Sequence, residues 1–447
     1  MTAGPRGNRV RDQELAYHSI PRSLFDALAN GGGGPAAIRV LLAAQRSKSV
    51  ALLRGVLHAL DGAGTEQARI ARPGAEVLIA VESRDPAAYA RAICYPSFDA
   101  WATHTLRGLS QQRAGAGTEL ARLATVAAAA AIAAGMDAQL AVRADPGMVF
   151  LPSLGAAHAS SDGATVRTSQ GRAEISWPGG RVEIPPEYRS APGWQPLRSC
   201  PLGEYTLIVD DLDPFRMPGE DGRIQPRLGA REAGDWSRVL RAGYQLLATT
   251  QPEVAEEVAL MIRVVVPLAP SAHGQLSSSS ADAFGAIAMS RPPDPYTCGV
   301  TFAHELQHLK LSALRDIVPL TEPDDGRRYY APWRDDPRPA SGLLQGAYAH
   351  LGITRFWRAA RQLASGEAQA RADSEFGLWR EGTARAVAAL LASGQLTSAG
   401  ADFVRGMSAT IGPWLQEPVP ATARAKAAAD ARAHLARWEL NNGPAPA

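Results

Sequence analysis

Two histidines, His304 and His308, stand four residues apart, and Glu305 directly follows the first of them. Residues i and i+4 lie on one face of an α-helix, so both imidazoles can bind the same divalent ion. This is the H-E-x-x-H pattern of metal-dependent enzymes. The neighbouring Phe302 and Leu306 make the helix apolar, and histidines buried in such a helix would be costly without partners. We therefore predict a metal-binding helix here.

The third ligand is less closely defined by the sequence. His350 lies in an apolar helical run, where an unpaired imidazole makes little sense, and it is the preferred candidate. Glu381, on a later predicted helix, is the alternative ligand for a gluzincin-type site. Asp316 lies about 120° away from the ligand face of a continuous helix. A metzincin site is excluded, because Leu311 and Leu314 stand where that longer motif needs glycine and histidine.

A proline-rich loop between the histidines, residues 327–339, carries two tyrosines, a tryptophan and several arginines. These residue types suit an ordered binding rim, and Tyr330 is a candidate cofactor-binding residue in it. Arginine can hold a carboxylate through two parallel hydrogen bonds, so Arg334 or Arg338 could bind a dicarboxylic co-substrate. Alternatively, both arginines could pair with the two aspartates between them.

Three segments, 304–314, 330–339 and 342–357, together resemble the HExxH-motif peptide-modification proteins that accompany ribosomally made peptide precursors and radical-SAM maturases. The likeness runs from about residue 283 to 357, with a weaker likeness over residues 30–54. The family is regarded as iron(II)- and 2-oxoglutarate-dependent peptide β-hydroxylases.

The resemblance implies a precursor peptide as substrate and a radical-SAM maturase of the same pathway as a partner. It implies that His304, His308 and His350 hold iron, although the usual set is two histidines and a carboxylate. Arg334 or Arg338 would hold the far carboxylate of 2-oxoglutarate, and Glu305 would orient a ligand or bound water.

Two other functions stay open. In a zinc metallopeptidase, Glu305 would deprotonate a zinc-bound water. In a metal-free interaction protein, the histidines would serve no metal. Spacing does not distinguish iron from zinc, but the missing peptidase signatures and the arginine-rich loop favour the oxygenase.

Composition narrows the class of protein. The chain has 447 residues, 46% of them hydrophobic, and a formal net charge of +2, so it lacks the basic field that binds nucleic acids or anionic membranes. Three scattered cysteines exclude a disulfide framework and favour the cytoplasm. The most apolar window, 120–135, is too short to cross a bilayer and predicts a buried helix.

The pattern predicts an α+β fold that is predominantly α-helical. Residues 1–140 read as a helical region, 141–300 as a mixed α+β region, and 301–447 as a helical region that carries the H-E-x-x-H helix. A strand over 284–290 should lead into that helix. Expected helices cover 35–60, 119–134, 230–249, 341–364, 368–393 and 421–440, and expected strands cover 148–151, 164–168, 173–177, 181–184, 205–209 and 259–268.

Two polar clusters have alternative interpretations. The serine run 277–280 could line the site or form a flexible loop. The acids Asp210, Asp211 and Asp213 could bind a second metal, but their place after a strand favours a turn.

Overall fold

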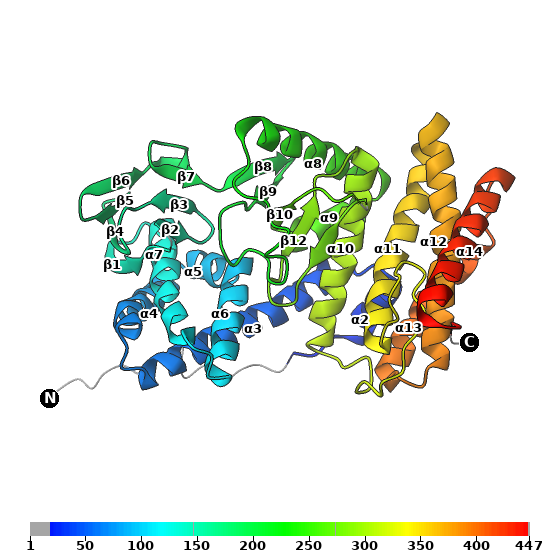
Figure 1. Ribbon diagram of the computed structural model, residues 1–447, viewed down its shortest axis with the longest axis horizontal. Coiled ribbons are helices and arrows are strands. Elements are labelled where there is room, and N and C mark those ends of the chain that lie inside the picture. Colours follow the sequence, from blue (N-terminus) through cyan, green and yellow to red (C-terminus); the bar gives the residue numbers. More distant parts are fainter. Residues whose placement is uncertain (1–17, 146, 273, 446–447) are drawn as a thin grey trace.

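The protein is mainly helical, with its strands confined to the middle of the chain. A computed structural model describes residues 18–145, 147–272 and 274–445 (Figure 1). Helices make up 57% and strands 15% of it. Helices come first, sheets follow, and helices close the chain. The predicted fold class, α+β and predominantly α-helical, is confirmed.

Two of the N-terminal helices begin at side-chain caps. Thr65 accepts a hydrogen bond from the Ala68 amide, and Asp85 accepts from two amides of the next helix. The N-terminal helices are α2 (Arg22–Ala29), α3 (Gly34–Gly62), α4 (Glu66–Arg84), α5 (Pro86–Ile93), α6 (Pro96–Ser110), the 3₁₀-helix η1 (Ala116–Arg122) and α7 (Leu123–Ala133).

The apolar segment predicted as a buried helix is η1 with α7. Ala116–Ala133 is apolar enough by length and composition to cross a membrane, but 67% of it is buried inside the protein. Nine of the eleven residues of α7 are buried. The helix is therefore a core element of this fold.

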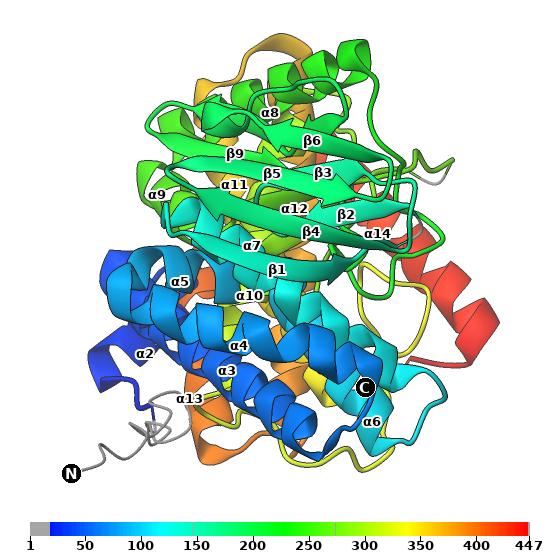
Figure 2. The same cartoon turned by 90° about the vertical axis from the view of Figure 1, so that its left-hand side faces the viewer.

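Two antiparallel sheets pack over these helices. One has the strand order β1-β4-β5-β6 and the other the order β2-β3-β7. Figure 2 shows the first sheet lying over α3, α4 and α5. The strands are β1 (Ala138–Arg143), β2 (Met148–Leu151), β3 (Gly155–His158), β4 (Gly163–Ser169), β5 (Arg172–Trp177), β6 (Gly180–Ile184) and β7 (Trp194–Pro196).

A five-stranded mixed sheet carries the chain toward the H-E-x-x-H helix. Its order is β11-β12-β10-β9-β8, with β10 parallel to both β12 and β9. All five residues of β10 and of β12 are buried, as expected for inner parallel strands. The strands are β8 (Arg198–Leu202), β9 (Tyr205–Val209), β10 (Val264–Leu268), β11 (Ser277–Ser279) and β12 (Ala286–Ser290).

The remaining helices flank this sheet and form the C-terminal bundle. They are α8 (Ala230–Thr250), α9 (Pro252–Met261), α10 (Pro295–Arg315), α11 (Ala340–Leu363), α12 (Gly366–Ala392), α13 (Ser398–Leu415) and α14 (Ala421–Asn442). A short 3₁₀-helix, η2 (Pro186–Tyr188), precedes β7.

One predicted strand is partly wrong. The apolar run 259–268 was expected to be extended throughout, but α9 continues to Met261 and β10 begins only at Val264. An apolar run by itself does not distinguish a buried helix end from a buried strand. The strand expected before the H-E-x-x-H helix is confirmed as β12.

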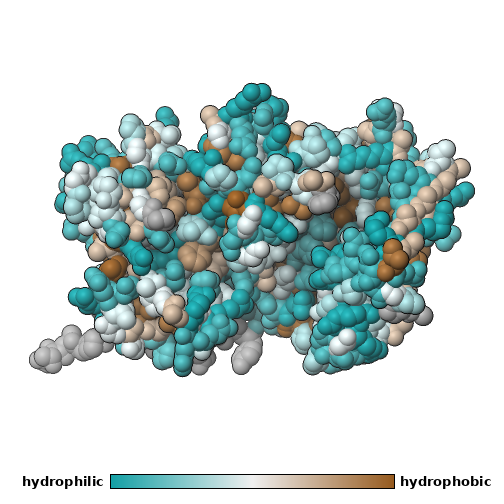
Figure 3. Space-filling model, in the orientation of Figure 1, coloured by the Kyte–Doolittle hydropathy of each residue, from teal (hydrophilic) through white to brown (hydrophobic). Residues whose placement is uncertain are grey.

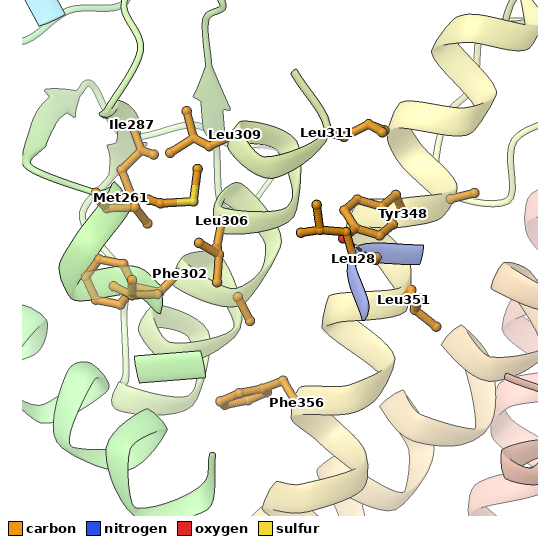
Figure 4. Close-up of a cluster of buried hydrophobic side chains, with 14 of the residues drawn as sticks. Leu28, Met261, Ile287, Phe302, Leu306, Leu309, Leu311, Tyr348, Leu351 and Phe356 are labelled. Atoms are coloured by element: carbon orange, nitrogen blue, oxygen red, sulfur yellow. Dashed lines mark hydrogen bonds between the residues drawn. The ribbon is translucent and has the colours of Figure 1, made fainter. Parts of the chain in front are cut away.

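Helix α10 sits in the largest hydrophobic core. Leu306 and Leu309 face Met261 and Ile287, which come from α9 and β12 (Figure 4). All four side chains are at most 1% exposed. Burial of this apolar face fixes the rotation of α10, so its histidines must lie on another face.

The outer surface seen in Figure 3 is mainly hydrophilic, and its hydrophobic residues form small scattered patches. Among the described residues, only Leu363, Leu391 and Leu440 are exposed large hydrophobics. This view therefore gives no broad apolar surface that would require a covering partner.

Candidate metal centre and its cavity

Helix α10 begins at a well-formed N-cap. The Asp294 carboxylate accepts a hydrogen bond of 2.8 Å from the Thr297 amide, and Pro295 occupies the first turn. The helix then runs without interruption to Arg315. His304 and His308 therefore lie on successive turns of one rigid element.

The two imidazoles of α10 meet as the spacing predicts. The Nε2 atoms of His304 and His308 are 3.1 Å apart, and the ring centroids are 4.7 Å apart. Two nitrogens bound to one ion at about 2.1 Å, with an angle near 90–100°, are separated by about 3.0–3.2 Å. The same separation suits a hydrogen bond between the rings when no ion is bound. The separation is therefore compatible both with a shared metal ion and with a hydrogen bond between the rings.

His350 comes from α11 and lies against the same pair. Its ring centroid is 5.5 Å from that of His304. Its Nδ1 contacts the Gly346 carbonyl oxygen at 2.8 Å, so Nδ1 carries the proton and Nε2 keeps its lone pair. The Trp333 ring stacks on His350 at 4.0 Å, and the Trp379 ring contacts it at 4.8 Å. Two indoles thus fix the imidazole plane.

Burial keeps His304 and His350 neutral. Burial, with a smaller contribution from the neighbouring His308, lowers the pKa of His304 to about 4. Burial, followed by the effect of His304, also places the pKa of His350 well below its ordinary value. A neutral imidazole is the form that binds a metal ion.

His308 is oriented by a residue that sequence reasoning missed. Its Nδ1 lies 3.1 Å from Oε1 of Gln345, so Nδ1 donates and Nε2 faces His304. An acceptor on the outer nitrogen is the usual support for a ligating histidine. The available signal was a lone amide within the apolar start of α11, residues 343–348.

Glu305 is an unusual carboxylate. It is 0% exposed, and neither of its oxygens has a hydrogen-bond partner within the described structure. One oxygen lies 3.8 Å from Nε2 of His304. A buried polar group without a partner costs free energy, so this carboxylate is suited to meet a proton, a water or an ion.

These groups open into one large cavity of about 860 Å³. Such a volume lies within the usual range for ligand sites, about 300–1,000 Å³. The serine strand β11 forms part of the wall, which supports the interpretation of the serine run as a lining segment. Sequence reasoning did not find Trp379 and Glu375 of α12, which also line it.

Two predicted arginines line this cavity. Nε of Arg334 and Nη1 of Arg338 donate to the same carboxylate, Asp336, at 2.6 and 3.1 Å. The predicted alternative of pairing with an aspartate is therefore observed, and both arginines also line the cavity. Nε of Arg338 is buried and has no partner among the described residues. One carboxylate thus accepts hydrogen bonds from two guanidinium groups, and Nε of Arg338 is left without an acceptor.

Other candidates lie away from the cavity. Tyr330 turns to the C-terminal helix, where its hydroxyl is 2.8 Å from Nδ1 of His434, so its position does not support the predicted co-substrate contact. Asp316 accepts hydrogen bonds from Gln45 and Lys48 on α3. Glu381 has a side chain that is 66% exposed, and it lines a different pocket.

The acidic residues after β9 lie in a turn, where they are paired with arginines or hydrogen-bonded. Asp213 is held by Arg122, and Asp211 by Arg198 and Arg227. Asp210 accepts the backbone amides of the turn and the hydroxyl of Tyr95. The interpretation as a turn is therefore favoured over a second metal site.

The residues fit a metal ion only in part. Within residues 18–145, 147–272 and 274–445, no group of three or more His, Cys, Asp or Glu side chains is arranged to hold one. The structure positions His304 and His308 and sets the third imidazole beside them, without bringing three donor atoms to a common point. At the same site, the carboxylate of Glu305 and the buried Nδ1 of His304 lack hydrogen-bond partners among the described residues.

A buried polar network holds α10 against the glycine loop before α3. Lys310 is 1% exposed, forms an ion pair of 2.8 Å with Glu257, and donates to the carbonyl of Gly32. Gln307 donates to the carbonyl of Gly31. The glycine loop at 31–33 therefore anchors the helix that carries the histidines.

No family model and no curated protein matches this chain.

Proposed function

We propose that this protein is a cytoplasmic iron(II)- and 2-oxoglutarate-dependent oxygenase that hydroxylates a side-chain β-carbon in a ribosomally made precursor peptide. The observation that carries the proposal is the shared cavity, which contains both the imidazole group and a pair of guanidinium groups with only one carboxylate between them. A dicarboxylate that binds a metal at one end needs these two features together.

His304, His308 and His350 would hold the iron. When bound, iron and 2-oxoglutarate use dioxygen to oxidise the peptide, with succinate and carbon dioxide as co-products. Gln345 and the Gly346 carbonyl hold the outer nitrogens of two of the rings. These contacts keep the free Nε2 lone pairs available, as a metal site requires.

Arg338 would bind the far carboxylate of the co-substrate through its guanidinium group, with Arg334 as a second positive charge. Arg338 also lies close over Gly342, where an added Cβ would come within 3.0 Å of its Nε. This packing leaves the guanidinium little freedom, which favours a fixed geometry for the bound carboxylate.

An open sheet edge in the cavity supports a peptide substrate. β11 is the last strand of its sheet, paired on one side only with β12. The Ser290 amide donates to the Leu276 carbonyl, so by strand alternation the backbone groups of Ser277 and Ser279 face away from β12. An extended peptide can pair with such an edge through main-chain hydrogen bonds.

A zinc metallopeptidase is the second candidate, and Glu305 is the observation that favours it. A buried carboxylate without partners, 3.8 Å from Nε2 of His304, is suitably placed to act as a general base on a water. The proposed radical-SAM partner rests on the sequence resemblance alone.

Succinate production distinguishes the candidates. Iron(II), 2-oxoglutarate and the precursor peptide are added without oxygen, and succinate is measured after air is admitted. We expect turnover in the wild type and a loss of at least about tenfold in His308→Ala and Arg338→Gln. Arg328→Gln is the control, since Arg328 pairs with Asp324 in the same loop but does not line the cavity.

Absence of succinate, together with peptide cleavage by the zinc-loaded protein, would overturn the oxygenase. Full succinate production in Arg338→Gln would overturn the assignment of the carboxylate site. Glu305→Gln provides a further test, because it should abolish a peptidase but only weaken a hydroxylase.

A further inference from the structure

A second cavity, separate from the histidine site, lies between the N-terminal helices and the five-stranded sheet. Its volume is about 600 Å³. Helices α3 and α5 form one side, and Leu260 of α9 and Phe284 before β12 form the other. None of its lining residues lines the histidine cavity. The two cavities could therefore be occupied independently.

Positive charge dominates this second cavity. Three arginines line it, and Asp99 is the only acidic residue in its wall. Arg46 and Arg91 are exposed, and neither forms a hydrogen bond or an ion pair within the described part of the chain. Arg263 lies deeper, where its Nη2 donates to the Cys94 carbonyl. The excess of guanidinium groups suits an anion.

Two buried polar atoms of the cavity lack partners. Asp99 is 3% exposed, and its Oδ1 has no hydrogen-bond partner in the described structure. Nε of Arg263 is also buried without a partner there. Unsatisfied buried groups are rare in folded proteins, because each costs free energy. A ligand with a hydrogen-bond donor would satisfy Asp99, and an acceptor would satisfy Arg263.

Apolar side chains form another part of the wall, beside the polar Gln45 and Ser49. Leu42, Leu260 and Phe284 line the cavity, and Phe284 is only 3% exposed. A fully hydrated inorganic anion would gain nothing from these side chains, whereas an apolar ligand body would be removed from water by them. The ligand therefore has a charged end and an apolar body.

We infer that this second cavity binds a small amphipathic organic acid. Arg46 and Arg91 take its anionic group at the mouth, and Leu42, Leu260 and Phe284 cover its apolar body. An N–H or O–H group of the ligand donates to Oδ1 of Asp99. The inference does not depend on the proposed oxygenase function, because it uses none of the residues of the histidine cavity.

The probe is 8-anilinonaphthalene-1-sulfonate, which combines an anionic sulfonate, an aromatic body and an N–H donor. Its fluorescence is titrated with the full-length protein. We expect one saturable site per chain, with Kd raised at least about tenfold in the double variant Arg46→Gln/Arg91→Gln. Arg39→Gln is the matched control, since Arg39 is exposed on the same helix α3 but outside the cavity, and its Kd should not change.

A second variant tests the location. Ala90→Trp puts a large side chain into the cavity while it keeps all three arginines, and it should abolish saturable binding in protein whose circular dichroism is unchanged. Non-saturable fluorescence, or an unchanged Kd in the double arginine variant or in Ala90→Trp, would overturn the inference.

Discussion

Gly352→Ala tests how closely the two histidine-bearing helices, α10 and α11, must pack. A Cβ at position 352 of α11 would lie 2.9 Å from the Ala303 carbonyl oxygen of α10 and 2.7 Å from Cγ of Gln307. Ordinary contact begins at 3.4 Å, so the backbone oxygen must retreat by about 0.5 Å. Ala303 precedes one histidine of the pair, and position 352 lies two residues after His350. The substitution therefore pushes the third imidazole away from the other two.

We expect this overpacking to lower the free energy of unfolding by about 1–3 kcal/mol. It should also weaken iron binding by about tenfold or more, because a displaced ligand shell lowers metal affinity. Stability is measured by denaturant unfolding and affinity by competition with a chelator. Gly412→Ala in α13 is the control, since nothing lies within 4 Å of its added Cβ, and it should be neutral or stabilising. Wild-type stability and iron affinity in Gly352→Ala would refute the claim that α10 and α11 are held in tight register.

Three further predictions concern buried groups. Lys310→Met should cost about 3–5 kcal/mol in unfolding free energy because it leaves Glu257 buried without its cation, and the double variant with Glu257→Gln should recover part of that loss. Burial raises the pKa of Asp99 to about 7, so its contribution to stability is fully present at acidic pH and is lost as the pH rises through 7. The unfolding free energy of Asp99→Asn, measured relative to that of the wild type, should therefore rise by about 3 kcal/mol between pH 5 and pH 8. If the difference between the two proteins is the same at both pH values, Asp99 does not ionise in a buried site. Trp333→Ala removes the ring stacked on His350 and should weaken iron binding about tenfold, with Trp333→Phe retaining most of the affinity; equal affinity in all three proteins would show that stacking does not position the imidazole.

Local patterns explain what the sequence could predict of the site. The meeting of His304 and His308 follows from helical periodicity alone, since four residues span about one turn. His350 could be found because a histidine in an apolar helical run needs a partner. Arg334 and Arg338 could be found because their loop is rigid and rich in arginine. In each case the signal lies within a few residues of the functional group.

Contacts between segments that are distant in the chain could not be predicted from the sequence. Tyr330 was predicted at the cavity, but its hydroxyl contacts His434, 104 residues later, and its ring packs on Trp438. Gln345 and Trp379 support the histidines from other helices, and no local pattern marks those roles. The helix α13 was not predicted, although its buried residues Phe403, Val404, Met407 and Ile411 follow helical spacing, so a local signal for it was present.

Strand β11 shows the same limit at the level of secondary structure. Three successive serines are typical of a loop, because serine side chains compete for backbone hydrogen bonds. Pairing with the buried strand β12 overrides that tendency and makes the segment an edge strand. The tertiary partner, and not the local sequence, decides its conformation.

The visible absorbance of the iron-loaded protein under anaerobic conditions tests the central claim most directly. If His304, His308 and His350 hold one iron beside Arg338, 2-oxoglutarate should produce a metal-to-ligand charge-transfer band that saturates at one iron and one co-substrate per chain. The double variant His304→Ala/His308→Ala should show no band, and Arg338→Gln should need more 2-oxoglutarate to reach it. A wild-type protein that binds no iron, or that binds iron and gives no band with saturating 2-oxoglutarate, would contradict the account.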